Sequence, residues 1–296
     1  MMDPKSIKRQ TPVHVAAAAL FGDRLRQVCR WLSRIENGPP KKRVEAIHQL
    51  RVSTRRAMAA LVLFDEFFPP GHARWYTKWL RQIRRAAGSA RELDVMMHDL
   101  EASGEIDVET RGQLLKKLRK QRQRADRPIL DICKQLKGGK LLKQRWRKTS
   151  SRMLRVPRPY FPFGEWARGK LQQEITRFFS AHPEDMEDVD QLHEFRIASK
   201  HFRYALELLE PAFPRQRYAR VMPVMLRLQD RLGRINDHVT ALHRLKKWPE
   251  DKPRGRKAIR LEKKRLRCAI AEFGLWWTDK RLARLEKWLE ALPDRI

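Results

Sequence analysis

The sequence predicts an all-α protein made of two similar antiparallel helical bundles. Apolar residues recur at spacings of three and four along most of the chain, as on one face of an amphipathic helix, and no segment alternates cleanly as a strand would. A repeat at a constant offset of 145 residues extends over about fifty residues. Such a repeat indicates duplication of one four-helix unit.

The predicted elements follow from the places where this pattern is interrupted. The interruptions are the turn-forming stretches "NGPP" (37–40), "PPG" (69–71), "SGE" (103–105), "HPED" (182–185) and "WPEDKP" (248–253). The helices expected between them cover 11–36, 42–68, 72–101, 107–137, 164–181, 187–210, 215–247, 254–272 and 278–291. The chain is thereby divided into a first bundle at 11–137, a basic linker at 138–163 and a second bundle at 164–291.

The stretch 138–164 contains no Asp or Glu, and Gly, Ser and Pro cluster in parts of it. We interpret it as the connection between the bundles. Two readings stay open: a solvated linker with a short helix, which is the usual fate of a charge run, or a basic flap that closes over an anion.

The charge balance indicates a polyanionic partner. The 296 residues include 66 Lys and Arg against 35 Asp and Glu, a formal net charge of +31. This excess opposes compaction through self-repulsion, so we expect it to serve nucleic acid, an anionic membrane surface or a long phosphate polymer. Cys29, Cys133 and Cys268 form no paired motif, which favours a reducing cytoplasm. The short apolar run near the N-terminus predicts an amphipathic helix instead of a signal peptide or membrane span, and hence a soluble protein.

The repeat is clearest in "HQLRVSTRR" at 48–56 and "HEFRIASKH" at 193–201. The matched pairs are His48/His193, Arg51/Arg196, Arg55/Lys200, Leu61/Leu206, Leu63/Leu208, Phe68/Phe213, Gly88/Gly233, Glu92/Asp237, His98/His243 and Leu100/Leu245. On a helix the apolar matches fall on one face, which we expect to be core. The histidine and the cations form a stripe on another face, with successive members about 5–6 Å apart.

The next helix of each half carries more cations at helical spacing. They are Arg74, Lys78, Arg81 and Arg85 in the first half and Arg220, Arg227, Arg231 and Arg234 in the second. If the two stripes of a half face each other across a groove, each bundle holds a cationic trough. Arginine suits that trough because its planar guanidinium group binds phosphate oxygens through paired hydrogen bonds and keeps its charge, while histidine adds a donor that responds to pH near neutrality.

Other kinds of site have weaker support. There is no HExxH, no close HxxxH pair and no DxDxDG loop, so we expect no metal. No P-loop, G-x-G-x-x-G or G-x-S-x-G motif is present either, and no nucleophile–base pair can be identified by spacing. Asp94, Asn236 and Asp237 either hold neighbouring arginines by hydrogen bonds or are ordinary helix-surface or cap residues. The nine tryptophans could stack nucleic-acid bases, but their place within amphipathic helices favours packing.

These segments resemble the CHAD family, the conserved-histidine α-helical domain. "HQLRVSTRR" followed by "ALVLF", and "HEFRIASKHFRYALELLEPAFP", are similar to its two histidine-led motifs, and "GSARELDV" (88–95) and "LGRIND" (232–237) to the motif that follows each. The similarity covers about residues 11–291. It implies two pseudo-symmetric bundles with a basic surface and a central groove or cavity, and binding of inorganic polyphosphate, often at polyphosphate granules. CHAD domains are often fused to a CYTH domain; here we expect a stand-alone domain, which supports binding and not hydrolysis.

Two positions depart from the family pattern. Met58 stands where the first motif often has a further basic residue, whereas the matching Arg203 is kept. His201 stands where Arg or Lys is usual. We therefore expect the trough of the first half to be less charged at its distal end.

The expected function is non-enzymatic binding of inorganic polyphosphate by a cytoplasmic protein that targets or organises polyphosphate granules. The alternatives are a basic helical protein that binds nucleic acid non-specifically and an enzyme that processes phosphoanhydrides. We expect no cofactor. The residues expected to bind polyphosphate are His48, Arg51, Arg55, Arg56, Lys78, Arg81, Arg85, Arg91, His193, Arg196, Lys200, His201, Arg203, Arg220, Arg227, Arg231 and Arg234, with Asp94, Asn236 and Asp237 in support.

Overall fold

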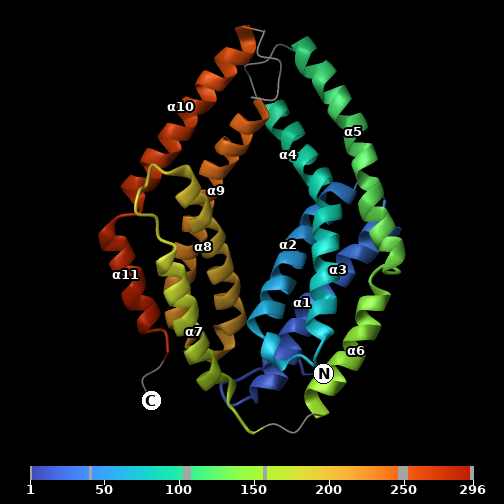
Figure 1. Ribbon diagram of the computed structural model, residues 1–296, viewed down its shortest axis with the longest axis vertical. Helices are drawn as coiled ribbons and strands as arrows, with labels where there is room; N and C mark the ends of the chain where they lie inside the picture. Colours follow the sequence, from blue (N-terminus) through green and yellow to red (C-terminus); the bar gives the residue numbers. More distant parts are fainter. Residues whose placement is uncertain (1, 40–41, 103–107, 156–158, 246–252, 294–296) are drawn as a thin grey trace. The chain divides into compact units, whose positions relative to one another are not determined.

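The computed structural model describes residues 2–39, 42–102, 108–155, 159–245 and 253–293 (Figure 1). Over these residues the chain is helical and contains no β-strand, so the predicted all-α class is confirmed. The chain divides into two compact units. Unit 1 contains residues 1–7 and 11–160, and unit 2 contains residues 8–10 and 161–296.

The helices of each unit follow one another along the chain (Figure 1). Unit 1 contains η1 (Pro4–Ser6), α1 (Val13–Asn37), α2 (Arg43–Leu63), η3 (Asp65–Phe67), α3 (His72–Ala86), α4 (Gly88–Ala102), α5 (Val108–Gln135) and α6 (Lys140–Arg155). Unit 2 contains α7 (Phe163–Ser180), α8 (Val189–Leu209), η4 (Glu210–Ala212), α9 (Arg215–Leu245), α10 (Pro253–Trp276) and α11 (Asp279–Glu290).

An aromatic cluster forms the centre of unit 1. The ring of Phe21 on α1 lies 5.0 Å from Phe68, 5.3 Å from Tyr76 on α3 and 4.9 Å from Trp146 on α6, all in edge-on arrangements. Edge-on aromatic pairs contribute about 0.5–1.5 kcal/mol beyond the area that they bury. The core therefore fixes α1, α3 and α6 to one another.

A left-handed turn joins α5 directly to α6. Lys137, Gly138 and Gly139 all have positive φ, at 48°, 59° and 88°, and the N–H of Gly138 donates to the carbonyl of Cys133 at 2.9 Å. This is how helices commonly end on glycine. A side chain at Gly139 would also meet the Cα of Cys29 at 2.8 Å, so the close approach of α1 requires a glycine here.

The expected linker over 138–163 is wrong for most of its length. Residues 140–155 form α6, which packs on α1 and buries Leu142, Trp146 and Met153. The first bundle therefore does not end at 137, and unit 1 extends to residue 160. The run of cations had suggested a solvated segment, but the apolar residues at spacings of four and seven already form a helical face.

One predicted helix is divided in two. Instead of a single helix at 72–101, α3 ends at Ala86 and α4 begins at Gly88, and the N–H of Ala87 between them donates to the carbonyl of Ile83 at 3.0 Å. The matching helix of unit 2, α9, is continuous. The predicted break at 103–105 and most of the one at 248–253 lie outside the described residues.

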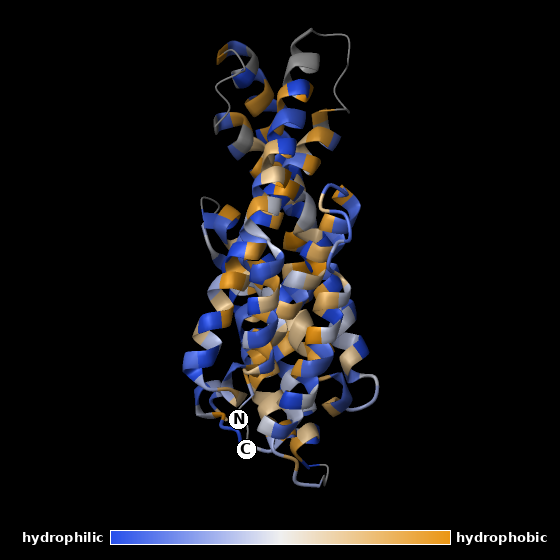
Figure 2. Cartoon of the chain, turned by 90° about the vertical axis from the view of Figure 1, so that its left-hand side faces the viewer, coloured by the Kyte–Doolittle hydropathy of each residue, from blue (hydrophilic) through white to orange (hydrophobic). Residues whose placement is uncertain are grey.

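The core of unit 2 is likewise aromatic. Phe178 of α7 lies 4.9 Å from Phe202 and 5.3 Å from Phe195, both on α8. Trp277 lies 5.8 Å from Phe195, and its indole N–H donates to Nε2 of His182 at 3.1 Å. Hydrophobic and hydrophilic residues are interspersed along the helices (Figure 2), as expected for amphipathic helices.

The offset of the sequence repeat is kept by the elements. The short helices Asp65–Phe67 and Glu210–Ala212 lie 145 residues apart, and each follows the helix that carries a histidine-led segment. Positions of α2 and α8 can therefore be compared one by one.

Candidate functional site

The histidine-led segments lie on α2 and α8, with the apolar face turned into the core as expected. On α2, Leu50, Ala57 and Leu61 are at most 1% exposed. Another side of the helix carries His48 and the two arginines that follow it after three and seven residues, Arg51 and Arg55. All three side chains are half-buried. They are held partly out of water without being sealed in the core.

In unit 1 this stripe meets cations from the next two helices. Nη1 of Arg51 donates to the carbonyl oxygen of Arg84 at 3.4 Å, and a Cβ on Gly88 would lie 3.5 Å from the same nitrogen. The guanidinium group of Arg51 therefore lies over the junction of α3 and α4. We call His48, Arg51, Arg55, Arg84 and Arg91 the unit 1 cluster.

The charges of the unit 1 cluster repel one another. The pKa of His48 is lowered by burial and by the charge of Arg91, and further by Arg55 and Arg51, with Glu45 opposing. The pKa of Arg51 is also lowered by burial and by repulsion from Arg55, Arg84 and Arg91, with Glu92 opposing. Like charges that are partly desolvated and held together destabilise the unliganded protein. A bound anion would remove this cost.

Unit 2 carries a similar arrangement with a different partner. Nδ1 of His193 on α8 lies 3.0 Å from Oδ1 of Asn236 on α9, so Nδ1 carries the proton and Nε2 is left for another partner. His193 is exposed, and Arg196 and Lys200 on the same helix are half-buried. We call His193, Arg196, Lys200 and Asn236 the unit 2 cluster.

The two clusters correspond through the repeat. His48 and Arg91 are 43 residues apart, as are His193 and Asn236, so Arg91 on α4 and Asn236 on α9 occupy equivalent positions of the repeat. That position holds a cation in unit 1 and a neutral amide in unit 2. Arg84 likewise matches Gln229. The two half-sites therefore differ in charge at equivalent positions of the repeat.

Two residues predicted to bind the ligand are engaged inside unit 2 instead. Nδ1 of His201 pairs with the buried Glu174 of α7 at 3.0 Å. Nε of Arg203 donates to Gln229 at 2.7 Å, its Nη1 pairs with Glu207, and its guanidinium carbon lies 4.5 Å from the ring centroid of Tyr204. Both residues lie on the flanks of α8, about 80° on either side of His193, which is why they reach neighbouring helices.

Burial and the partners of Glu174 have opposite effects on it. Burial would raise the pKa of this carboxyl group, but the hydrogen bond and charge of His201, together with Arg177 and Lys170, bring the pKa below its ordinary value. Glu174 is therefore a charged group inside unit 2, and His201 compensates it.

The second stripes do not face the first ones, so the trough expected in each bundle is not formed this way. On α9, Nη1 of Arg231 donates to the carbonyl oxygen of Glu272 at 3.2 Å, and Nη1 of Arg234 pairs with the carboxylate of Glu272 at 3.5 Å. These arginines therefore point to α10 and not to α8. On α3, Lys78, Arg81 and Arg85 are exposed on the side opposite the buried face of that helix.

The remaining predicted residues are placed as follows. Arg56 is half-buried on the flank of α2, at the position that matches His201. Arg220 and Arg227 are exposed on α9, and Asp237 is exposed beside Asn236. Among the described residues, no side-chain contact joins Arg220, Arg227 or Asp237 to either cluster.

Asp94 pairs with an arginine that the sequence did not single out. Nε of Arg122 on α5 donates to Asp94 Oδ1 at 2.6 Å and Nη2 to Oδ2 at 3.3 Å, and Nη1 pairs with Asp126. Asp126 also pairs with Arg43, at the start of α2, at 3.0 Å. Burial alone would lower the pKa of Arg122, but Asp94 and Asp126 raise it. This buried network ties together α2, α4 and α5, the first two of which carry unit 1 cluster residues.

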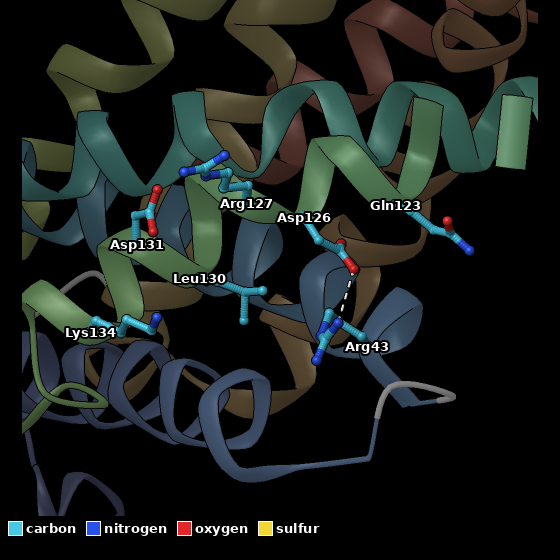
Figure 3. Close-up of a pocket in the computed structure, with 7 residues that line it drawn as sticks. All are labelled: Arg43, Gln123, Asp126, Arg127, Leu130, Asp131 and Lys134. Carbon is cyan, nitrogen blue, oxygen red and sulfur yellow. Dashed lines mark hydrogen bonds and ion pairs between the residues drawn. The ribbon is translucent and has the colours of Figure 1, made fainter. Parts of the chain in front are cut away.

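A cleft of about 380 Å³ opens beside this network and has mixed charge. Figure 3 shows Arg43 and Asp126 paired at one end, with Arg127, Asp131 and Lys134 along α5. The carboxylates would repel a polyanion, so we do not place phosphate binding here. Among the described residues no group of three His, Cys, Asp or Glu side chains is positioned to hold a metal ion.

Sequence reasoning missed Arg84 and Arg122, and it expected at most a short helix in a solvated linker where α6 packs on α1. Arg84 stands outside the stripe of Arg81 and Arg85 and shows its role only through its contact with Arg51. Arg122 lies on a helix crowded with exposed cations, and spacing does not distinguish it from them. The available signal was its spacing from Asp126, because an arginine and an aspartate four residues apart on one helix can pair.

The fold corresponds to a known class of helical domain. A profile described as "CHAD domain" matches residues 19–246, so the chain belongs to the CHAD domain family. The crystal structure of the CHAD domain from the plant Ricinus communis has a TM-score of 0.70 and 21% identity, over 97% of this chain and 94% of that one. PptA from Streptomyces chartreusis has a TM-score of 0.59 and 16% identity, over 90% and 99%. No curated protein matches the chain.

Within the described ranges, every helix is too short or too polar to cross a lipid bilayer.

Proposed function

We propose that this protein binds inorganic polyphosphate through the unit 1 cluster and the unit 2 cluster, without chemical turnover. The family to which the chain belongs is reported to bind polyphosphate in general. Inside a cell, such a protein would collect where polyphosphate accumulates, as in granules.

The observation that carries the proposal is the set of mutually repelling cations in unit 1, most of them half-buried. Arg51 is held over the α3–α4 junction although Arg55, Arg84 and Arg91 all lower its pKa. Selection for stability alone would favour a neutral or acidic residue at one of these positions. A chain of phosphates supplies several negative charges at short spacing, so it neutralises the whole cluster at once.

Polyphosphate fits the clusters better than nucleic acid does. The residues gathered in unit 1 are guanidinium groups and an imidazole, with no exposed aromatic side chain among them on which a base could stack. Polyphosphate has no bases and needs only cations and hydrogen-bond donors. Affinity should fall steeply with salt, by the counterion-release reasoning established for nucleic-acid phosphates.

Binding without hydrolysis is the simplest role for these residues. The three cations whose charges act on His48 are Arg51, Arg55 and Arg91, and arginines do not exchange protons near neutral pH. Release of orthophosphate by the purified protein with added Mg²⁺, lost in a His48→Ala, His193→Ala double variant, would establish an enzyme instead.

The test compares two variants with the same change in charge. The first replaces Arg51, Arg55, Arg196 and Lys200 with Gln. The control replaces Lys116, Lys117, Lys120 and Arg124 with Gln, four exposed cations on α5. Titration calorimetry with tripolyphosphate and long-chain polyphosphate should show a loss of about tenfold to a hundredfold for the first variant and a much smaller one for the control.

Equal losses would mean that the clusters are only part of a general positive field, and would contradict the proposal. Far-UV circular dichroism and thermal unfolding of both variants exclude a loss that arises from unfolding. Single Arg51→Gln and Lys200→Gln variants provide a milder perturbation of the same sites.

A further inference from the structure

A second cationic surface lies on α6, apart from the clusters. We call the exposed residues Lys140, Lys143, Arg147, Lys148 and Arg155 the α6 face. None of the five forms an ion pair within the described part of the chain. The chain has no Asp or Glu between 132 and 164, so no acidic residue of the helix itself compensates them.

The orientation of α6 is fixed by contacts on its other sides. Trp146 is packed against Phe21, and Nδ1 of His72 on α3 lies 2.8 Å from Oγ1 of Thr149. Nη1 of Arg152 lies 3.2 Å from Nε2 of the same histidine. The guanidinium group of Arg145 also stacks 5.2 Å from the ring centroid of Trp75. The helix cannot rotate, and the α6 face is therefore held toward solvent.

The cations of the α6 face spread over about 140° of the helix surface and along its whole length. From Lys140 to Arg155 the helix rises about 22 Å. Lys140, Lys143 and Arg147 follow one another at spacings of three and four, about 5–6 Å apart, and Arg155 lies seven residues beyond Lys148. The buried face of α6 already contains Trp146, and the exposed side has no aromatic ring. Among the described residues of α6, the one large apolar side chain that is exposed is Leu154, at 42%. Such a cationic surface suits a linear polyanion without bases better than a single-stranded nucleic acid, which gains affinity by stacking.

The α6 face is separate from the unit 1 cluster. α6 packs on α1, and Figure 1 shows α3 between α6 and α2. A short oligophosphate at the unit 1 cluster does not reach the α6 face, because the body of α3 lies between them. A long chain can leave the cluster and continue around unit 1.

We propose that the α6 face binds a further stretch of the polyphosphate chain that is held at the clusters. The inference rests on the proposed function and extends it: the second contact is intramolecular once the first has formed, so it increases affinity for long chains only. The α6 face thus makes the affinity for polyphosphate increase with the length of the chain.

The experiment uses a variant with Lys143, Arg147, Lys148 and Arg155 replaced by Gln, and the control with Lys116, Lys117, Lys120 and Arg124 replaced by Gln. Both remove four exposed cations from unit 1. For long-chain polyphosphate we expect the α6 variant to bind about tenfold or more weakly than the control. For tripolyphosphate we expect the two to agree within about twofold, because this ligand occupies only the clusters. A Lys143→Gln, Arg147→Gln variant repeats the comparison with less perturbation of folding.

Equal affinity of the α6 variant and the control for long-chain polyphosphate would overturn the inference and leave the proposed function intact. A loss of affinity for single-stranded RNA without a loss for long-chain polyphosphate would also overturn it, and would make the α6 face a nucleic-acid surface. If the wild-type protein bound neither tripolyphosphate nor long-chain polyphosphate, the proposed function itself would fail.

Discussion

Arg122 is expected to be the most sensitive charged residue of unit 1. Its side chain is 8% exposed and that of Asp94 is 3% exposed, and Asp94, which lies one turn beyond Arg91 on α4, accepts two hydrogen bonds from it. Replacing Arg122 with Met leaves the carboxylate of Asp94 buried without its partner.

The size of the effect follows from the geometry. At the 2.6 Å separation of Nε and Oδ1, and an effective dielectric constant of about 20, the attraction is about 6 kcal/mol. Desolvation of both charges offsets much of this, and removal of one partner of such a buried pair typically costs about 3–5 kcal/mol. For a unit of this size, that corresponds to a fall of about 6–20 °C in the melting temperature of unit 1.

The assay is thermal and urea unfolding followed by circular dichroism. The matched control is Arg119→Met, because Arg119 pairs with Glu101 at 3.5 Å with side chains 64% and 53% exposed. An exposed pair of this kind contributes less than about 1 kcal/mol. A double Asp94→Leu, Arg122→Met variant should be more stable than Arg122→Met alone, since no carboxylate is then left at position 94. If Arg122→Met lost no more stability than Arg119→Met, the reasoning about the buried network would be refuted.

Three further predictions concern histidines and the two halves. Arg91→Asn, which copies the Asn236 of unit 2, should raise the pKa of His48, because it removes a charge that lowers it; an unchanged pKa in an NMR titration would contradict the cluster. The pKa of His72 is lowered by burial and by the nearby Arg145 and Arg152, so on acidification the unfolded chain binds the proton at a higher pH than the folded protein does. The free energy of unfolding, measured in urea, should therefore fall as the pH drops below about 6.5, and it should fall less in His72→Gln. Arg203→Met, which copies Met58, should leave polyphosphate affinity nearly unchanged, whereas Lys200→Met should lower it about fivefold; equal losses would place Arg203 at the ligand.

Much of the fold could be predicted from the sequence because it depends on local periodicity. The spacing of Leu50, Ala57 and Leu61 fixes which side of α2 is buried, and the offset of the repeat places α8 in the same way. The position of His48, Arg51 and Arg55 on a different side of α2 follows from the same helical periodicity, which fixes the angle between these residues and the apolar ones.

The partners of these residues could not be predicted, because they depend on how helices turn against one another. Arg231 and Arg234 share a face of α9, but only the packing of α10 shows that this face meets Glu272. Arg203 appeared to continue the stripe of Lys200, yet its angle on α8 brings it to Gln229.

The segment 138–163 shows a different limit. Two glycines and the absence of acidic residues led to the prediction of a linker, although Leu142, Trp146 and Met153 have the spacing of a buried helix face. The glycines in fact end α5 and allow the close approach to Cys29, and the cations lie on the outer face of a helix whose inner face joins the core.

The measurement that tests the central claim most directly is a calorimetric titration of the wild-type protein. Polyphosphate of several lengths is compared with single-stranded RNA at low and at physiological salt. The account predicts tighter binding of polyphosphate at both salt concentrations, with affinity that rises with chain length and falls steeply with salt. Tight binding of RNA at physiological salt, with short polyphosphate unable to displace it, would contradict the account.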